Sequence, residues 1–214
     1  MDQRIKECKT IGKIKGLSKD KPLVFFKGFS SRLELDDANM NVLDVAMRCI
    51  PYDVTGFIWD GDDYSTASFS GVVLSVMERY PEKVWIAAKK RSERKQFYES
   101  WENRIPANVT VHLILFDDSK WPSAEYFKLG ISMYKSALRA KFKQVEIFCL
   151  GGGTASMTHE FKGDKEAHTL SKHTNHTRWF LFLMTRKSAD GTQVESTFNT
   201  GKPNSFLAVE EWNK

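Results

Sequence analysis

Between residues 23 and 150 the chain alternates short apolar runs with longer segments whose apolar residues recur at helical spacing. The short runs are rich in β-branched and aromatic residues and are bounded by glycine, proline or charged residues, which is typical of buried strands. They are Leu23–Phe26, Thr55–Trp59, Val84–Ala88, Val109–Phe116 and Val145–Leu150. The segments between them have one apolar face each, which predicts amphipathic helices.

Capping and terminating residues agree with this division. Asp36 or Asp37 can cap the helix between the first two runs, and Pro51 would end it. Further helices are predicted at residues 69–80, at about 92–104, and from a cap at Ser123 to about residue 142.

Alternating strands and helices at this spacing predict βαβ units, which build a parallel sheet covered by helices on both faces. We therefore expect a single Rossmann-like, three-layer α/β domain over residues 21–214, with a mostly parallel sheet of about five strands. Beyond Gly153 the pattern changes. Apolar residues 179–185 and residues 193–198 flank the turn signal Asp190-Gly191, and this predicts a C-terminal β-hairpin.

Charge and cysteine usage narrow the class of protein. Residues 1–20 are rich in lysine and glycine and show no periodicity, so we expect a loosely ordered basic arm. The net charge of +5 is modest, and basic residues are not interleaved with aromatic ones, so we do not expect nucleic-acid binding. No window approaches the roughly 18 apolar residues of a membrane span. The three cysteines are far apart, which argues against a disulfide framework and favours a reducing, cytoplasmic location.

Open parallel sheets bind ligands beyond the carboxyl ends of their strands, where the strand order reverses. The glycine loop after the fifth run is the most suggestive segment, because glycines let a ligand approach backbone N–H groups and a following helix would favour an anion. It lacks the Walker ending and the G-x-G-x-x-G spacing, and it could equally be a tight turn that binds nothing. The candidate ligand-binding residues are Gly28, Ser30, Ser31, Arg91, Gly151, Gly152, Gly153 and Thr154.

Residues 151–154 and Glu160 resemble the Gly-Gly-x-Gly-Thr-x-x-Glu motif of the lysine-decarboxylase-like phosphoribohydrolases. In that family the motif holds a nucleotide phosphate, so the resemblance implies the same role for this loop. The resemblance covers about ten residues. The spacing differs, since Glu160 lies six residues after Thr154 instead of three.

Asp60-Gly61-Asp62 follows an apolar run and resembles the first motif of the haloacid-dehalogenase-like phosphatases, in which the first Asp is a nucleophile and the second an acid. The resemblance implies that Asp117-Asp118 binds Mg²⁺. Three features depart from the family: its Ser or Thr would fall at Ala87 or Ala88, its Lys has no counterpart before the acidic pair, and an extra βα unit precedes the first motif. The alternative interpretation is that these aspartates cap helices and end strands.

The polar segment after the glycine loop contains His159, His168, His173 and His176 at a spacing that matches no common zinc site. Solvated histidines are the simpler interpretation. His159 and Glu160 remain candidate acid–base residues because they follow the glycine turn closely.

These observations favour a soluble protein that binds a phosphorylated or nucleotide-like small anion at its strand ends, and they leave open whether it is an enzyme. Its candidate catalytic residues are Asp60, Asp62, Asp117, His159 and Glu160. One alternative is a non-catalytic interaction module that uses the basic arm or the free hairpin edge, where a homodimer could also form. A lesser alternative is a Mg²⁺-dependent, phosphatase-like hydrolase.

Overall fold

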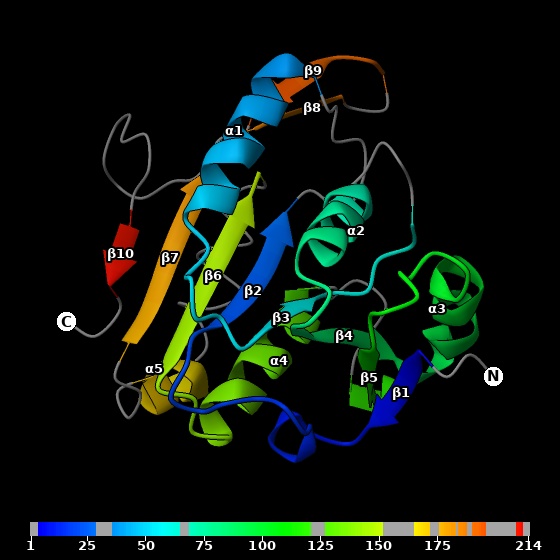
Figure 1. Ribbon diagram of the computed structural model, residues 1–214, viewed down its shortest axis with the longest axis vertical. Coiled ribbons are helices and arrows are strands. Elements are labelled where there is room, and N and C mark those ends of the chain that lie inside the picture. Colours follow the sequence, from blue (N-terminus) through cyan, green and yellow to red (C-terminus); the bar gives the residue numbers. More distant parts are fainter. Residues whose placement is uncertain are drawn as a thin grey trace.

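The computed structural model of the chain describes residues 4–28, 36–64, 69–120, 127–151, 165–171, 176–182, 184–187, 190–195 and 209–211. Within these residues an eight-stranded sheet has the order β1-β5-β4-β3-β2-β6-β7-β10 (Figure 1). Its strands are β1 (Ile5–Cys8), β2 (Leu23–Gly28), β3 (Gly56–Trp59), β4 (Val84–Lys90), β5 (Val111–Phe116), β6 (Gln144–Leu150), β7 (His176–Phe182) and β10 (Val209–Glu211). All neighbouring strands are parallel except β7 and β10, which are antiparallel.

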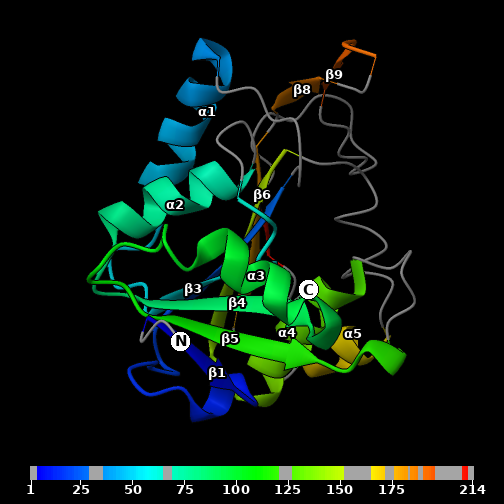
Figure 2. The same cartoon turned by 90° about the vertical axis from the view of Figure 1, so that its right-hand side faces the viewer.

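Helices cover both faces of this sheet, as Figure 2 shows from the side. One face carries α1 (Asp37–Arg48), α2 (Phe69–Arg79) and α3 (Arg94–Trp101). The other face carries α4 (Phe127–Arg139) and the short 3₁₀ helix η1 (Ile11–Lys13), and α5 (Lys165–Ser171) packs against α4. Two further 3₁₀ turns, η2 (Arg91–Glu93) and η3 (Asp118–Lys120), follow β4 and β5.

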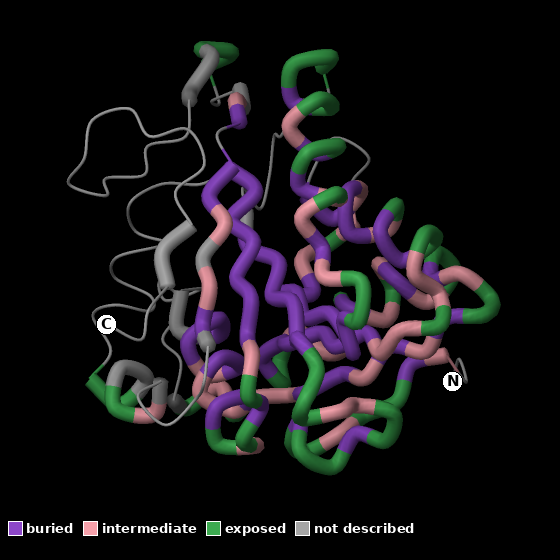
Figure 3. Tube along the Cα trace, turned by 60° about the vertical axis from the view of Figure 1, so that its left-hand side comes forward, coloured by how far each residue is buried: buried purple, intermediate pink, exposed green. Residues whose placement is uncertain are grey.

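Because both faces are covered, the central strands are apolar on both sides. Along β2, Val24 and Phe26 pack under α1–α3, whereas Leu23 and Phe25 pack under α4, and none of the four is more than 1% exposed. Figure 3 shows the same contrast along the chain, with buried strands and exposed outer helix faces. Continuous apolar runs at these positions are therefore what the fold requires.

The predicted fold class is confirmed: the chain forms a Rossmann-like α/β fold with a mostly parallel sheet between two helical layers. The expected number of about five strands was too low. Each of the five predicted strands is present, and β1, β7 and β10 extend the sheet at its two edges.

The N-terminal segment differs from the expected loosely ordered arm. Ile5–Cys8 pairs in parallel with residues 111–114 of β5, and the Ile11 and Ile14 side chains are buried. The side chain of Arg4 donates hydrogen bonds to the backbone oxygens of Glu102 and Ile105, beyond the end of α3. Residues 4–14 are thus part of the sheet and its core.

Helix boundaries follow local capping. Asp36 caps α1 as predicted, because its side chain accepts a hydrogen bond from the Asn39 N–H at 2.8 Å. The predicted fourth helix extends to about residue 142, but α4 ends at Arg139 and Lys141 adopts a φ of +63°. Phe142 is nevertheless buried, since the chain turns back onto the sheet after α4.

The predicted C-terminal hairpin is present as a separate two-stranded sheet. β8 (Thr185–Lys187) pairs antiparallel with β9 (Gln193–Glu195), and the Asp190 side chain accepts a hydrogen bond from Thr192 N–H in the turn. The apolar run at 179–185 is divided: its first part belongs to β7 in the main sheet, and only its last residue enters β8.

Among the described helices, none combines the length and the apolar character that crossing a membrane would need.

Candidate functional site

The strand order reverses between β2 and β6. From β2, the chain places β3, β4 and β5 successively on one side, and it then crosses over through α4 to put β6 and β7 on the other side. This reversal separates the loops that follow β2 and β6, and such a point is where doubly wound sheets bind ligands.

Two of the predicted ligand-binding glycines meet at this point. Gly28 ends β2 in register with Leu150, the last residue of β6, and Gly151 follows directly. Gly151 has a φ of +73°, and its N–H donates to the Phe182 oxygen at the end of β7, 3.0 Å away. A residue with a side chain would be strained at this φ, so glycine is required for the chain to leave β6 in this direction.

Several predicted site residues lie outside the described residues. They are Ser30, Ser31, Gly152, Gly153, Thr154, His159 and Glu160. Of the predicted site residues, the structure therefore locates Gly28, Gly151, Asp60, Asp62, Arg91 and Asp117.

Next to the reversal, a buried ion pair joins β2 to the end of β3. Lys27 Nζ lies 2.5 Å from Asp60 Oδ2, and the two side chains are 7% and 17% exposed. The other oxygen of this carboxylate, Asp60 Oδ1, is buried and has no hydrogen-bond partner within the described part of the chain. The pair fixes the carboxylate while one of its oxygens stays available as an acceptor.

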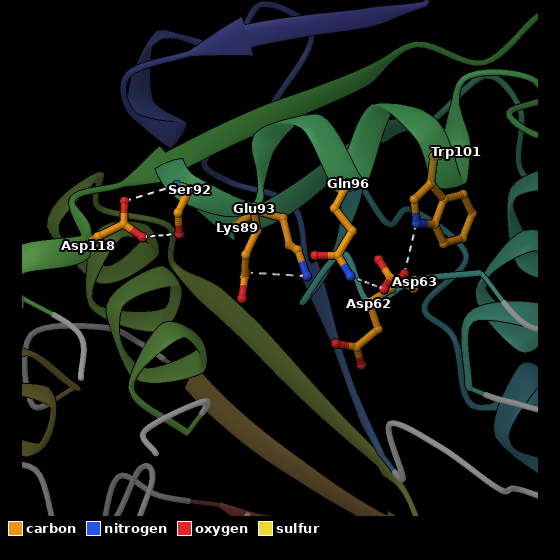
Figure 4. Close-up of polar contacts among 8 residues, drawn as sticks. All are labelled: Asp62, Asp63, Lys89, Ser92, Glu93, Gln96, Trp101 and Asp118. Atoms are coloured by element: carbon orange, nitrogen blue, oxygen red, sulfur yellow. Dashed lines mark hydrogen bonds and ion pairs between the residues drawn. The ribbon is translucent and has the colours of Figure 1, made fainter. Parts of the chain in front are cut away.

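The turn after Asp60 is held by α3. Gly61 has a φ of +65°, and a Cβ there would lie 3.1 to 3.3 Å from Phe97, Lys89 and the Ala88 oxygen. Trp101 Nε1 donates to the Asp62 backbone oxygen at 2.8 Å, and the Gln96 side chain donates to the Asp63 carboxylate. Figure 4 shows the Asp62 carboxylate pointing away from the Trp101 ring and from α3.

This position changes the acidity of Asp62. Burial of the carboxyl, together with the negative charge of Asp60, raises the pKa of Asp62 to about 7, although Lys89 and Lys27 act in the opposite direction. A carboxyl group with this pKa exchanges its proton near neutral pH, which is the property a general acid or base needs.

A second buried lysine lies at the end of β4. Lys89 is 2% exposed, and its Nζ lies 3.4 Å from Glu93 Oε2. The neighbouring Lys90 is 7% exposed, whereas Arg91, the residue of this run that we predicted to bind a ligand, is exposed. The candidate selected from the sequence is thus the most solvent-accessible of the three basic residues at this strand end.

Lys27, Lys89 and Glu93 were not predicted as site residues. A lysine that closes a buried apolar strand is a usable signal, since its charge must be paired if the strand is buried. The identity of each partner depends on strand order, however, and strand order is not visible in the sequence.

Asp117 is not brought together with Asp60. It follows β5, and β4 lies between β5 and β3 in the sheet. Its exposed carboxylate accepts hydrogen bonds from the N–H and hydroxyl groups of Ser119. Asp118 instead accepts hydrogen bonds from the backbone and side chain of Ser92, and these bonds lower the pKa of its carboxyl.

The described residues contain no group of three or more His, Cys, Asp or Glu side chains arranged to hold a metal ion. The Mg²⁺ site implied by the phosphatase resemblance stays a prediction. The ionisable cluster at the ends of β2, β3 and β4 can do two things chemically: it presents positive charge and a fixed carboxylate, and it can exchange a proton at Asp62.

No protein-family model matches the chain, and no curated protein matches it.

Proposed function

We propose that the chain binds a small phosphorylated or nucleotide-like anion where the strand order reverses. The observation that carries this proposal is the meeting of Gly28 and Gly151 at the carboxyl ends of adjacent strands, with the buried Lys27–Asp60 pair next to them. A glycine turn at this point lets a phosphate approach backbone N–H groups closely.

The surrounding charges support the same ligand class. Lys27 lies near the end of β2, and Lys89 and Lys90 end β4 on the other side of β3; each of the three is at most 7% exposed. Buried lysines near a ligand interact with it more strongly than solvated ones, because the local dielectric constant is lower. If the bound molecule is also a substrate, Asp62 is the residue best suited to transfer a proton to or from it.

Thermal unfolding of the full chain tests the proposal. We expect at least one compound from a panel of nucleotides, sugar phosphates and inorganic phosphate to raise Tm, since a ligand at a hundred times its Kd stabilises the native state by about 2.7 kcal/mol. Gly152→Asp puts a negative charge into the glycine loop and should abolish the shift. Asn108→Asp makes the same charge change at an exposed position before β5 and should leave the shift intact. No shift from any compound in the panel would contradict the proposal.

The second candidate function, a non-catalytic interaction module, rests on the small β8–β9 sheet. Its strands pair with no third strand among the described residues, and the outer edge of β9 therefore offers backbone groups for strand addition. Replacing Glu195 with proline would remove an outward-facing backbone donor from β9, because Glu195 pairs with Thr185, whose backbone groups also face away from the hairpin. If partner binding occurs there, a pull-down with the wild-type chain should lose its partner with this variant, and neutralising the N-terminal lysines should not have the same effect.

A further inference from the structure

We propose that Asp60 accepts a hydrogen bond from the 2-hydroxyl of a ribose and so selects ribonucleotides or ribose phosphates over their deoxy counterparts. This inference rests on the proposed function, because it assumes that the phosphate of the ligand lies at the β2–β6 reversal. It adds the chemical group that the site recognises beside the phosphate.

The two oxygens of the Asp60 carboxylate have different surroundings. Oδ2 lies 2.5 Å from Lys27 Nζ, whereas the buried Oδ1 has no hydrogen-bond partner within the described residues. A buried acceptor without a donor is unfavourable, and a ligand hydroxyl that donates to it recovers that loss on binding. Hydrogen bonds to an ionised acceptor are also stronger than neutral ones.

Asp60 lies at a suitable place relative to the phosphate. It follows β3, which pairs with β2, and β2 ends at Gly28 next to Gly151. Neighbouring strands are about 4.8 Å apart, so a ligand whose phosphate lies beside Gly28 and Gly151 can extend its sugar over the end of β3. In dinucleotide-binding doubly wound folds, an acidic side chain beyond the phosphate loop accepts a hydrogen bond from a ribose hydroxyl.

The neighbouring acidic side chains are less suited to this role. Asp63 already accepts a hydrogen bond from Gln96. Asp62, with a pKa of about 7, is protonated in a large fraction of molecules at neutral pH, and its protonated form is a poorer acceptor. The ion pair with Lys27 is therefore what distinguishes Asp60.

The experiment compares ligand pairs that differ by one hydroxyl. Binding of AMP, 2′-deoxy-AMP, ribose 5-phosphate and 2-deoxyribose 5-phosphate to the full chain is measured by calorimetry. We expect each ribose compound to bind about tenfold or more tightly than its deoxy counterpart, as the loss of one hydrogen bond to a charged group predicts. Tighter binding of AMP than of ribose 5-phosphate would identify a nucleotide, and equal binding a sugar phosphate.

Variants then assign the preference to Asp60. Asp60→Asn should reduce the ribose preference to less than about threefold, whereas Asp63→Asn, the same change at an exposed position, should retain it. Since Asp60→Asn removes the carboxylate that pairs with buried Lys27, the double variant Lys27→Gln/Asp60→Asn removes both charges of the pair and should also lose the preference.

The outcomes separate the two proposals. If no phosphorylated compound binds, the proposed function fails and this inference fails with it. If the ribose and deoxyribose compounds bind equally well, only the selection by Asp60 is wrong. A ribose preference that survives in both Asp60 variants would also overturn the inference.

Discussion

The side chain of Asn39 pairs with the backbone of Thr185 in the way that a neighbouring strand would. Its Nδ2 donates to the Thr185 oxygen at 2.9 Å, and its Oδ1 accepts from the Thr185 N–H at 3.0 Å. Asn39 is 2% exposed and lies in the first turn of α1, so this contact attaches the β8–β9 hairpin to the helix that follows β2.

The first prediction concerns this contact. Asn39→Ala removes both hydrogen bonds and leaves backbone groups of Thr185 without partners, so we expect the free energy of unfolding to fall by about 1–3 kcal/mol. Urea unfolding monitored by tryptophan fluorescence measures this change. Asn41→Ala, at an exposed position of the same helix, is the matched control and should be neutral or slightly stabilising. Equal effects of the two substitutions would show that the contact contributes nothing.

The second prediction concerns pH. The pKa of Asp62 is about 7 in the folded chain, above the ordinary value of 3.8, so the folded state binds this proton more tightly than the unfolded state does. Stability from this group is complete below about pH 4 and is lost as the pH rises to about 7. Asp62→Asn stays neutral throughout, and we expect it to be more stable than the wild type at pH 8 by more than about 1 kcal/mol.

Urea midpoints measured from pH 4 to pH 8 test this expectation. Burial also raises the pKa of Glu146, so the wild-type curve contains a second contribution of the same sign. The informative quantity is therefore the free energy of unfolding of Asp62→Asn minus that of the wild type. This difference should grow from pH 4 to pH 8. A difference that stays constant from pH 4 to pH 8 would contradict the raised pKa of Asp62.

The third prediction concerns the close approach of β3 and β4. A Cβ on Gly56 would lie 2.7 Å from the Val84 backbone oxygen and 2.9 Å from Leu17 Cδ2. Because backbone cannot move aside cheaply, Gly56→Ala should reduce the free energy of unfolding by about 1–3 kcal/mol. On Gly12, a Cβ would only make an ordinary contact with Ala140 at 3.6 Å, and Gly12→Ala should change stability by less than about 0.5 kcal/mol. Thermal unfolding of both variants in parallel tests the contrast.

The fourth prediction concerns the N-terminal strand. Deleting residues 1–8 removes β1 and its buried Ile5, and it leaves β5 as the edge of the sheet. We expect a loss of several kcal/mol of stability and a larger aggregated fraction, because unpaired edges associate readily. Lys6→Gln with Lys9→Gln changes the charge at exposed positions and keeps the strand, so it should behave as the wild type. A truncated chain as stable and monodisperse as the wild type, in urea unfolding and size-exclusion chromatography, would contradict this expectation.

How well the sequence predicts a strand depends on how far that strand is buried. β3 and β4 are buried on both faces, so nearly every residue is apolar and each run stands out against its polar surroundings. β1 is an edge strand in which only Ile5 is buried, and its residues Ile-Lys-Glu-Cys carry no periodic signal. Edge strands of this kind are recognised through their partners, and the partner of β1 lies about a hundred residues away.

The residues of the candidate site also fall into those that the sequence predicts and those that depend on strand order. Asp60 and Asp62 could be predicted because polar residues directly after an apolar strand mark its carboxyl end. The Lys27–Asp60 pair could not be, since it joins residues 33 positions apart that meet only because β2 and β3 are neighbours. Asp117 was chosen by the same rule as Asp60, and the strand order places it beyond β4.

The pairing of β1 with β5 has a consequence for the order in which the chain can fold during its synthesis. Residues 5–8 leave the ribosome first, but residues 111–114, to which they bind, follow more than a hundred residues later. At about 5–20 residues per second, the first strand must therefore wait several seconds for its partner. β2, β3 and β4 can pair meanwhile, so β1 is synthesised before these three strands but joins the sheet after them.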